Sequence, residues 1–300
     1  MNKKILITGG SGFVGENIID VLLKKDKKIK IYNLSRHKSV HKEVINLQKD
    51  IVKFDLDKID IEFDYIIHCL ALSNDKYCHD LDVATKVNID FTDRLLKFAT
   101  KQKKLKKFIH ISSIILYDNK NQSPVAEEDD LYIYYNNYSF TKGISEQYVQ
   151  YYTKRFNLPT IIFRLSNIYG PYQKTDNSPF LIPSKIQQAL EEHQIIALNA
   201  TPKRDWIYSV DAAEAIVASL SSNYNGILNL GTGHGTSVLE IIKTIANNLK
   251  VAYKFQNKKM TGPQNFYCDI KKTKKILKWK PKTNIKIGIK KMIDYINKNI

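Results

Sequence analysis

A tyrosine and a lysine lie one helical turn apart in the segment NNYSFTKGISEQ, at Tyr138 and Lys142. On a helix this spacing places both side chains on one face. A free tyrosine, with a pKa of about 10, is a poor base at neutral pH, whereas a neighbouring ammonium favours the phenolate. The pair is therefore suited to passing a proton to or from an alcohol oxygen while hydride moves at carbon. An ordinary surface helix of a chain with 18 tyrosines could also carry such a pair.

A glycine-rich turn lies close to the start of the chain. The stretch TGGSGFVG (8–15) follows the apolar segment KKILIT and opens a helical pattern at 13–25. Its glycines permit a tight turn, close approach of the backbone to a pyrophosphate, and packing of the helix on the strand. The free N–H groups at the helix N-terminus favour phosphate charge. The sequence therefore predicts a dinucleotide site formed by Gly9, Gly12, Phe13, Val14 and Gly15.

The end of the second predicted strand carries basic rather than acidic residues. An NAD-selective site places an acidic side chain there, which binds the 2′-hydroxyl of the adenosine ribose. The segment YNLSRHKS (32–39) offers Ser35 and Arg36, followed by His37 and Lys38. These residues suit a 2′-phosphate, so the sequence favours NADP(H) over NAD(H). The alternative is a basic loop that never touches the cofactor.

Short apolar strands alternate with helices in the first half of the chain. Strands are predicted at 3–8, 29–34, 51–54, 64–70, 107–112 and 159–165, and helices at 13–25, 80–103 and 138–156. Continuous apolar strands are typical of a parallel sheet that is covered on both faces. We therefore expect an α/β fold with a Rossmann-type doubly wound sheet in residues 1–165, to which 206–232 returns. Residues 166–205 and 233–300 are expected to form a smaller mixed α/β substrate domain over the carboxyl ends of the strands.

The composition argues against several classes of protein. With 43% hydrophobic and 26% charged residues, the chain is typical of soluble globular proteins, and no apolar run approaches the roughly 20 residues of a membrane span. Cys69, Cys78 and Cys268 show no CxxC spacing, so we expect no metal and a cytoplasmic location. The net charge is +17, but only five of the 47 basic residues are arginine, and the lysines form several separate clusters rather than one stripe. We therefore expect solvated lysine faces rather than a nucleic-acid site.

The glycine spacing, GxxGxxG, resembles that of the extended short-chain dehydrogenases/reductases. The likeness is strongest to the NAD-dependent epimerase/dehydratase branch, which acts on nucleotide-diphosphate sugars, and it covers nearly the whole chain. It implies that Asp55 and Leu56, in KFDLD, lie near the adenine. It also implies that Leu70 and Ala71, in HCLALS (68–73), line the cofactor site, and that Asn88, in KVNIDFTDRLL, shapes it.

The resemblance extends to the catalytic residues. HISSIILYD (110–118) is similar to the family's fifth-strand signature, in which a serine or threonine lies four residues before a tyrosine. This selects Ser113, with Ser112 as the second candidate. YSFTK matches the family's YxxxK, which implies that Tyr138 carries the proton and that Lys142 also holds the nicotinamide ribose. Ser113 would orient and polarise the substrate oxygen. The alternative for Ser113 is a hydroxyl that only closes the turn at the strand end.

Two later motifs resemble the family's sugar-nucleotide segments. In FRLSNIYGP (163–171), the asparagine that meets the sugar diphosphate corresponds to Asn167, with Arg164 as a structural partner. KRDWIYSVDAA (203–213) carries the best substrate-phosphate candidate, Arg204, because a planar guanidinium suits two phosphate oxygens. The alternative for Arg204 is a domain-joining salt bridge with Asp205.

The family's second diphosphate arginine has no counterpart in this sequence. It stands in a turn that reads MTGPQNFYCD (260–269) here. The resemblance therefore implies that the diphosphate clamp is incomplete or borrows Lys258 or Lys259.

Two reactions on a nucleotide-diphosphate sugar remain open, and the resemblance implies that both act at C4 of the sugar. A dehydratase would carry an acidic pair directly after the strand-five hydroxyl, where this chain has Ile114 and Ile115. An NADPH-dependent 4-ketoreductase is slightly favoured by the basic cluster after strand two. A 4-epimerase that retains NAD is favoured by the PVAEEDD loop (124–130) and the sugar motifs. A non-catalytic dinucleotide-binding regulator is a further alternative, and a homodimer through the helices at 80–103 and 138–156 is implied by resemblance.

Overall fold

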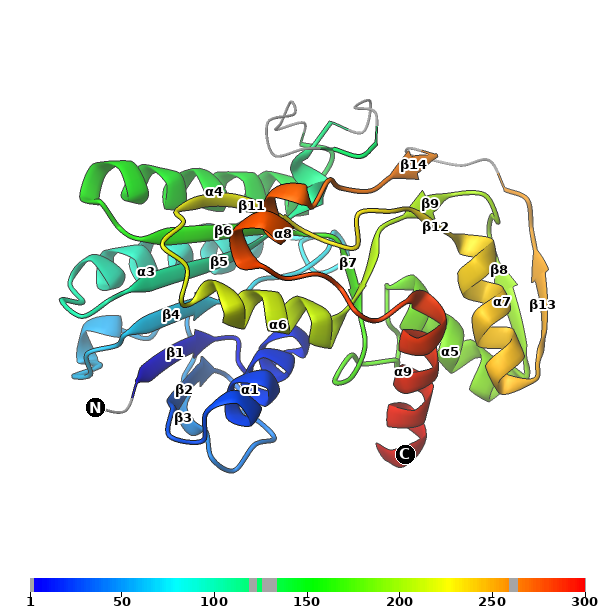
Figure 1. Cartoon of the computed structure of the whole chain (residues 1–300), viewed down its shortest axis with the longest axis horizontal. Coiled ribbons are helices and arrows are strands. Elements are labelled where there is room, and N and C mark those ends of the chain that lie inside the picture. The colour runs from blue at the N-terminus through cyan, green and yellow to red at the C-terminus, as the bar shows by residue number, and fades with distance from the viewer. Residues whose placement is uncertain (1–2, 119–122, 126–133, 259–263, 300) are drawn as a thin grey trace.

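Seven parallel strands form the central sheet in a computed structural model, which describes residues 3–118, 123–125, 134–258 and 264–299 (Figure 1). The strand order is β11-β6-β5-β4-β1-β2-β3, so the sheet grows outward from β1 in both directions, as in doubly wound folds. The α/β fold class predicted from the sequence is confirmed. The bounds of the strands are β1 Lys4–Thr8, β2 Lys30–Ser35, β3 Ile45–Gln48, β4 Tyr65–His68, β5 Lys107–Ser113, β6 Thr160–Leu165 and β11 Gly226–Leu230.

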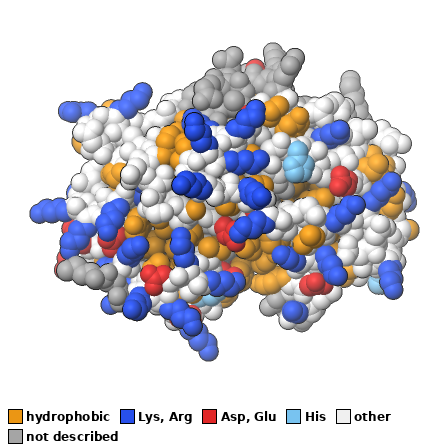
Figure 2. All heavy atoms as spheres, in the orientation of Figure 1, with side chains coloured by type: hydrophobic (Ala, Val, Ile, Leu, Met, Phe, Trp, Pro, Cys, Tyr) orange, Lys and Arg blue, Asp and Glu red, His pale blue; other side chains and the backbone are white. Residues whose placement is uncertain are grey.

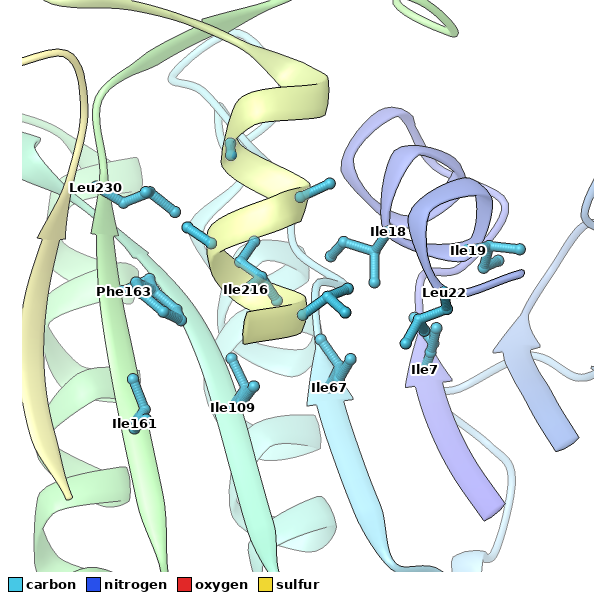
Figure 3. Close-up of a cluster of buried hydrophobic side chains, with 14 of the residues drawn as sticks. Ile7, Ile18, Ile19, Leu22, Ile67, Ile109, Ile161, Phe163, Ile216 and Leu230 are labelled. Atoms are coloured by element: carbon cyan, nitrogen blue, oxygen red, sulfur yellow. The ribbon is translucent and has the colours of Figure 1, made fainter. Parts of the chain in front are cut away.

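Helices cover both faces of this sheet, which is why its strands are apolar without alternation. In β1, Ile5 and Ile7 pack under α1 and α6, whereas Leu6 packs on the opposite face under α3 and α4. Figure 3 shows the first face, where Ile18 of α1 and Ile216 of α6 point toward the strands. The bounds of these helices are α1 Phe13–Lys25, α3 Phe91–Thr100, α4 Asn137–Phe156 and α6 Ser209–Ser219.

The remaining elements form small sheets and helices next to the carboxyl ends of the central strands (Figure 1). They have a separate apolar core, to which α5, α7 and α9 contribute. The elements are β7 Asn167–Tyr169, α5 Leu181–Glu192, β8 Gln194–Ala197, β9 Lys203–Arg204, β10 Trp206–Tyr208, β12 Thr236–Ser237, α7 Val238–Leu249, β13 Ala252–Phe255, β14 Asn265–Phe266 and α9 Ile285–Asn299. The strands pair as β10-β7, β12-β9-β14 and β13-β8. Helix α8 (Lys271–Leu277) instead packs against the core of the central sheet, beside β11 and α6.

The third strand lies earlier in the chain than the sequence predicted. The edge strand is β3, and residues 51–54 form a turn instead. Ile51 and Phe54 were read as strand residues because they are apolar, but they pack with the core under α3 from a turn. The half-exposed β3 carries too few apolar side chains to be recognised from its sequence.

The helix predicted at 80–103 is interrupted. It comprises α2 (Leu81–Thr85), a π-helical turn at Lys86–Asp90, and α3, which ends at Thr100. Such π-turns insert one extra residue and are frequent at functional sites. Here the turn carries Asn88, whose side chain is buried.

Charge is spread over the surface. Figure 2 shows Lys and Arg side chains scattered across this face rather than gathered in one stripe. In the described part of the chain, no helix is long and apolar enough to cross a membrane, and no three potential ligands gather around a metal position.

Candidate active site

The glycine loop joins β1 to α1 and fits a bound pyrophosphate. Gly9 adopts φ +71°, a conformation that favours glycine, and a Cβ there would lie 2.9 Å from the Cα of Leu70. A Cβ on Gly15 would lie 2.4 Å from the Gly9 oxygen, so the helix can approach the loop only without a side chain. Gly12 is the N-cap of α1, and no side chain caps this end. The N–H groups of its first turn, which begins with Phe13 and Val14, therefore face a position suited to phosphate.

The end of β2 carries Ser35 and Arg36, as the sequence placed them. Ser35 is buried, its Oγ lies 2.7 Å from Ser11 Oγ, and it donates to the His37 oxygen at 2.7 Å. The Arg36 side chain is exposed. The loop beyond them is held by Glu16 of α1, which accepts from Ser39 Oγ at 2.8 Å. The ribose end of the site is thus a preformed loop that carries the exposed cationic side chains of Arg36 and Lys38.

A short turn carries the two residues expected near the adenine. Asp55 accepts from the Asp57 N–H at 3.1 Å and caps a 3-10 turn at Leu56–Lys58, and Leu56 is buried. Arg94 of α3, which the sequence analysis did not single out, holds the preceding turn. Its guanidinium donates to the oxygens of Val52 (2.8 Å), Phe54 (3.0 Å) and Ile51. The only sequence signal was an arginine in a chain that has five.

The segment after β4 is fixed by Asn88. The Asn88 amide accepts from the Leu72 N–H at 2.8 Å and donates to the Leu72 oxygen at 3.2 Å. It also donates to Thr141 Oγ1 of α4 at 3.0 Å. Asn88 therefore positions the segment that carries the half-buried Leu70 and Ala71, next to the lysine of the YxxxK motif.

The three expected catalytic residues come together from β5 and α4. Ser113 is the last residue of β5 and lies close enough to Tyr138 to lower the pKa of its phenol, while its Oγ accepts from the Ile115 N–H at 3.2 Å. Asn136 begins α4 with a capping box, which fixes the first turn of the helix on which Tyr138 lies. Lys142 is buried one turn later and donates to the Ile111 oxygen of β5 at 2.7 Å.

The pKa values of this group differ from the simple expectation. Burial raises the pKa of Tyr138 to about 12, and the neighbouring Ser113 hydroxyl opposes that rise. Burial lowers the pKa of Lys142 to about 8, and the Glu146 carboxylate opposes that fall. In the protein without ligand, desolvation thus outweighs the effect that the lysine was expected to have on the phenol.

A buried ion pair lies on the next turn of α4. Arg164 of β6 and Glu146 are both fully buried, and the Arg164 Nε lies 3.2 and 3.3 Å from the two carboxylate oxygens. Ser112 Oγ donates to Glu146 at 2.7 Å, and Arg164 NH1 donates to Tyr117 Oη at 3.0 Å. Arg164 is thus a structural partner inside the sheet core.

The two substrate candidates lie at the junction with the smaller sheets. Asn167 Nδ2 donates to the Asp205 oxygen at 3.0 Å. Arg204 is half-buried, and its NH1 donates to the Lys203 oxygen at 2.9 Å. The Asp205 carboxylate accepts from Thr232 instead, through N–H (2.7 Å) and Oγ1 (2.6 Å). The salt bridge considered for Arg204 is therefore not the arrangement found.

Of the two lysines that could replace the missing arginine, the structure describes Lys258. Lys258 is exposed and donates its main-chain N–H to the Leu198 oxygen at 3.2 Å. Lys259, residues 260–263 of the C-terminal turn, and 126–130 of the PVAEEDD loop lie outside the described residues.

The fold and the site together define a dinucleotide-dependent enzyme of the short-chain dehydrogenase/reductase type. The sheet is doubly wound, no side chain caps the helix that follows the glycine turn, and Ser113 at the end of β5 lies beside Tyr138 and Lys142 of α4. The model of the NAD dependent epimerase/dehydratase family matches residues 5–231. This chain belongs to that family.

Individual relatives extend the likeness to the whole chain. A protein of Methanocaldococcus jannaschii, provisionally named UDP-glucose 4-epimerase, is 28% identical over 98% of this chain and 99% of its own. The solved UDP-N-acetylglucosamine 4-epimerase of Methanobrevibacter ruminantium M1 is 23% identical with a TM-score of 0.91, covering 100% and 99% of the two chains. The UDP-glucuronic acid 4-epimerase of Bacillus cereus, solved with NAD, is 26% identical with a TM-score of 0.85, covering 99% of each chain. Other relatives are named dTDP-D-glucose 4,6-dehydratase.

Proposed function

We propose that this protein is a nucleotide-sugar 4-epimerase that retains NAD. The observation that carries the proposal is the meeting of Ser113, Tyr138 and Lys142 beside a glycine loop that fits a dinucleotide. A relative provisionally named UDP-glucose 4-epimerase and a solved UDP-glucuronic acid 4-epimerase that holds NAD support it. The slight lean toward a reductase that the sequence suggested has no such support, and neither has the preference for NADP(H).

The chain's own groups can carry the proton transfers. When bound, the nicotinamide would accept hydride from the sugar carbon and return it. Tyr138 Oη would take the proton of the C4 hydroxyl and later give it back, while Ser113 would hold the same oxygen. Lys142, buried behind the phenol, would bind the nicotinamide ribose and stabilise the phenolate with its ammonium. Because the proton returns to the oxygen it left, no external acid is needed.

Dehydration is disfavoured by the residues that follow Ser113. Removing water from the sugar needs an acid and a base beside the reacting carbons. The turn at Ile114–Leu116 provides only aliphatic side chains, and Ile114 is buried with Val125 and Phe266. We therefore do not propose dehydration for this protein, although some of its relatives are named as dehydratases.

A 4-ketoreductase remains the second candidate, on one observation. The end of β2 presents Ser35 and the exposed Arg36 where NAD-selective sites carry an acid. An enzyme that exchanges NADPH at each turnover would use such residues. This reading has the same Tyr138 chemistry but requires the cofactor to leave.

One experiment separates the two candidates. The purified protein is denatured and the released nucleotide identified, and NADPH oxidation is then followed with several 4-keto sugar nucleotides. We expect bound NAD, no NADPH consumption, and interconversion of C4 epimers among UDP-sugars. Release of NADP, or steady NADPH consumption, would establish the reductase instead.

The proposal assigns the two regions different ligands. The central-sheet region would hold the dinucleotide and the smaller region the sugar nucleotide, with Asn167 and Arg204 on its diphosphate. Replacing Arg204 with Lys should raise the substrate KM and leave retained cofactor unchanged, because only the planar guanidinium can bind two phosphate oxygens.

We also propose a homodimer through α3 and α4. The aromatic side chains of Tyr148, Tyr151 and Phe156 are exposed on α4, which is unusual for a solvated helix. Light scattering should give twice the chain mass for the native protein and the monomer mass for Tyr151→Glu.

A further inference from the structure

Two buried histidines lie side by side behind the catalytic lysine, in the cores of neighbouring strands. His68 of β4 and His110 of β5 are each 1% exposed, and their ring centroids lie 5.3 Å apart. His110 Nε2 lies 3.4 Å from Lys142 Nζ and 3.4 Å from Ser145 Oγ. Among the described residues, His110 Nδ1 has no hydrogen-bond partner. The proposed mechanism uses neither histidine.

The hydrogen-bond directions fix the tautomer of His68. Thr92 Oγ1 donates its proton to the Asn88 oxygen at 2.7 Å, so toward His68 Nε2, at 2.8 Å, it can only accept. His68 Nε2 must therefore carry the hydrogen. His68 Nδ1 is then a bare nitrogen that accepts from Thr8 Oγ1 at 2.7 Å. Both partners are permanent, so His68 has one tautomer.

The tautomer of His110 depends on the protonation state of Lys142. Ser145 Oγ donates to the Lys142 oxygen at 2.9 Å, so it too can only accept toward His110 Nε2. When Lys142 is an ammonium, it donates one hydrogen to the Ile111 oxygen and can donate another to His110 Nε2, provided that Nε2 carries no hydrogen. A neutral amine no longer needs that acceptor, and an Nε2–H can then donate to Ser145 Oγ or to the amine. At Nδ1, no hydrogen-bond partner among the described residues selects one state over the other.

We propose that His110 is a positioning residue for Lys142, which holds the ammonium through the Nε2 lone pair and changes tautomer when the lysine loses its proton. The two states differ by one proton: the ammonium with the Nδ1–H ring becomes the neutral amine with the Nε2–H ring, and the proton that Lys142 loses passes to water. The imidazole is neutral in both states. The role in turnover rests on the proposed function, whereas the tautomer change does not.

The charges around the pair allow the change near neutral pH. Burial lowers the pKa of His110 well below its usual value, and the Lys142 ammonium lowers it further, so the ring does not become imidazolium. Burial also brings the pKa of Lys142 down to about 8. The titratable groups that face the pair are Glu146 on α4, Cys69 and His68 from β4 and its end, and Cys78 from the segment before α2.

Nitrogen spectroscopy tests the tautomer change in the full chain. Protein with 15N-labelled histidine rings is followed by long-range proton–nitrogen correlation from pH 6 to pH 10, with His110→Gln used for assignment. We expect His110 to pass from the Nδ1–H to the Nε2–H form as Lys142 deprotonates, while His68 stays in the Nε2–H form as an internal control. In Lys142→Met the step should vanish. A constant His110 tautomer in the native protein, or a step that persists in Lys142→Met, would overturn the proposal.

Kinetics test the positioning role with two matched variants. His110→Gln keeps an acceptor beside the ammonium, whereas His110→Leu removes it. We expect the alkaline limb of the kcat/KM profile to move to lower pH in His110→Leu and to stay in place in His110→Gln. Equal profiles in both variants would refute the positioning role, even if the protein proves to be an epimerase. Should no epimerase activity exist at all, the nitrogen spectra still decide the tautomer change.

Discussion

Two buried charges occupy successive turns of α4, and their surroundings differ. Glu146 faces the Arg164 guanidinium, and this pair raises the pKa of Arg164 against the effect of burial. Lys142 faces a main-chain oxygen and a neutral imidazole, and its pKa falls to about 8. A counter-charge in contact thus keeps both Glu146 and Arg164 ionised, and the ion pair links α4 to β6. Burial without a counter-charge in direct contact leaves a group that can titrate, which is what proton chemistry requires.

The largest expected effect is at the phenol next to the titrating lysine. Tyr138→Phe removes the proton carrier, and activity should fall by roughly 10²–10⁴-fold. Retained cofactor and the urea midpoint should stay near the native values, since no described main-chain contact is lost. Epimerase assays measure the activity, nucleotide release measures the retained cofactor, and urea denaturation gives the midpoint. Activity within tenfold of native would mean that another group carries the proton.

The ion pair should show its effect in stability instead. Glu146→Ala leaves a buried guanidinium without a carboxylate and should cost about 3–5 kcal/mol of unfolding free energy. The double variant Glu146→Leu/Arg164→Met removes both charges and should recover most of that loss. Urea denaturation compares them. If the single variant loses less than about 1 kcal/mol of unfolding free energy, the ion pair does not stabilise the contact between α4 and β6 as we propose.

Lys142→Met should give the opposite sign. Because the folded-state pKa lies below that of the unfolded chain, burial of the ammonium destabilises the native state fully below about pH 8, and this cost disappears as pH rises toward 10.5. The variant should be more stable than the native protein at pH 7, by up to about 3 kcal/mol, with the gain shrinking above pH 8. Unfolding curves from pH 6 to pH 10 measure it. A difference independent of pH would mean that Lys142 does not titrate there.

Arg94 offers a third kind of partner, main-chain oxygens. Arg94→Ala releases the turn before Asp55 and Leu56 and should weaken dinucleotide affinity by about tenfold, or roughly 1.4 kcal/mol. Affinity for nicotinamide mononucleotide and kcat at saturating cofactor should not change if this turn binds the adenine, as we expect. Calorimetry with both ligands decides, and an equal loss for both would indicate general destabilisation.

The smallest effect belongs to an exposed pair on a helix. Lys97 lies 2.6 Å from Asp93 with most of its side chain in solvent. Lys97→Ala should change stability by no more than about 0.5 kcal/mol. Against Glu146→Ala, this variant is the control that separates burial from charge, and equal losses would show that burial does not distinguish the two pairs.

The sequence predicted those features that depend on neighbouring residues. Periodicity gave α1 with its observed bounds, and the glycine turn and YxxxK spacing are local, so both could be read directly. The turn at 51–54 was misread as a strand because its apolar residues are held by Arg94, some 40 residues later. His110 and Glu146 were missed for the same reason. Their partners lie on other strands, and no spacing in the chain records which buried polar groups meet.

The central claim is that hydride leaves and returns to the same sugar carbon on a retained cofactor. It is tested most directly with UDP-glucose carrying deuterium at C4, incubated without added nicotinamide nucleotide and analysed by mass spectrometry and NMR. The account predicts both C4 epimers, each with the deuterium still at C4. Loss of deuterium from the sugar, or no second epimer from any UDP-sugar tried in this way, would contradict it.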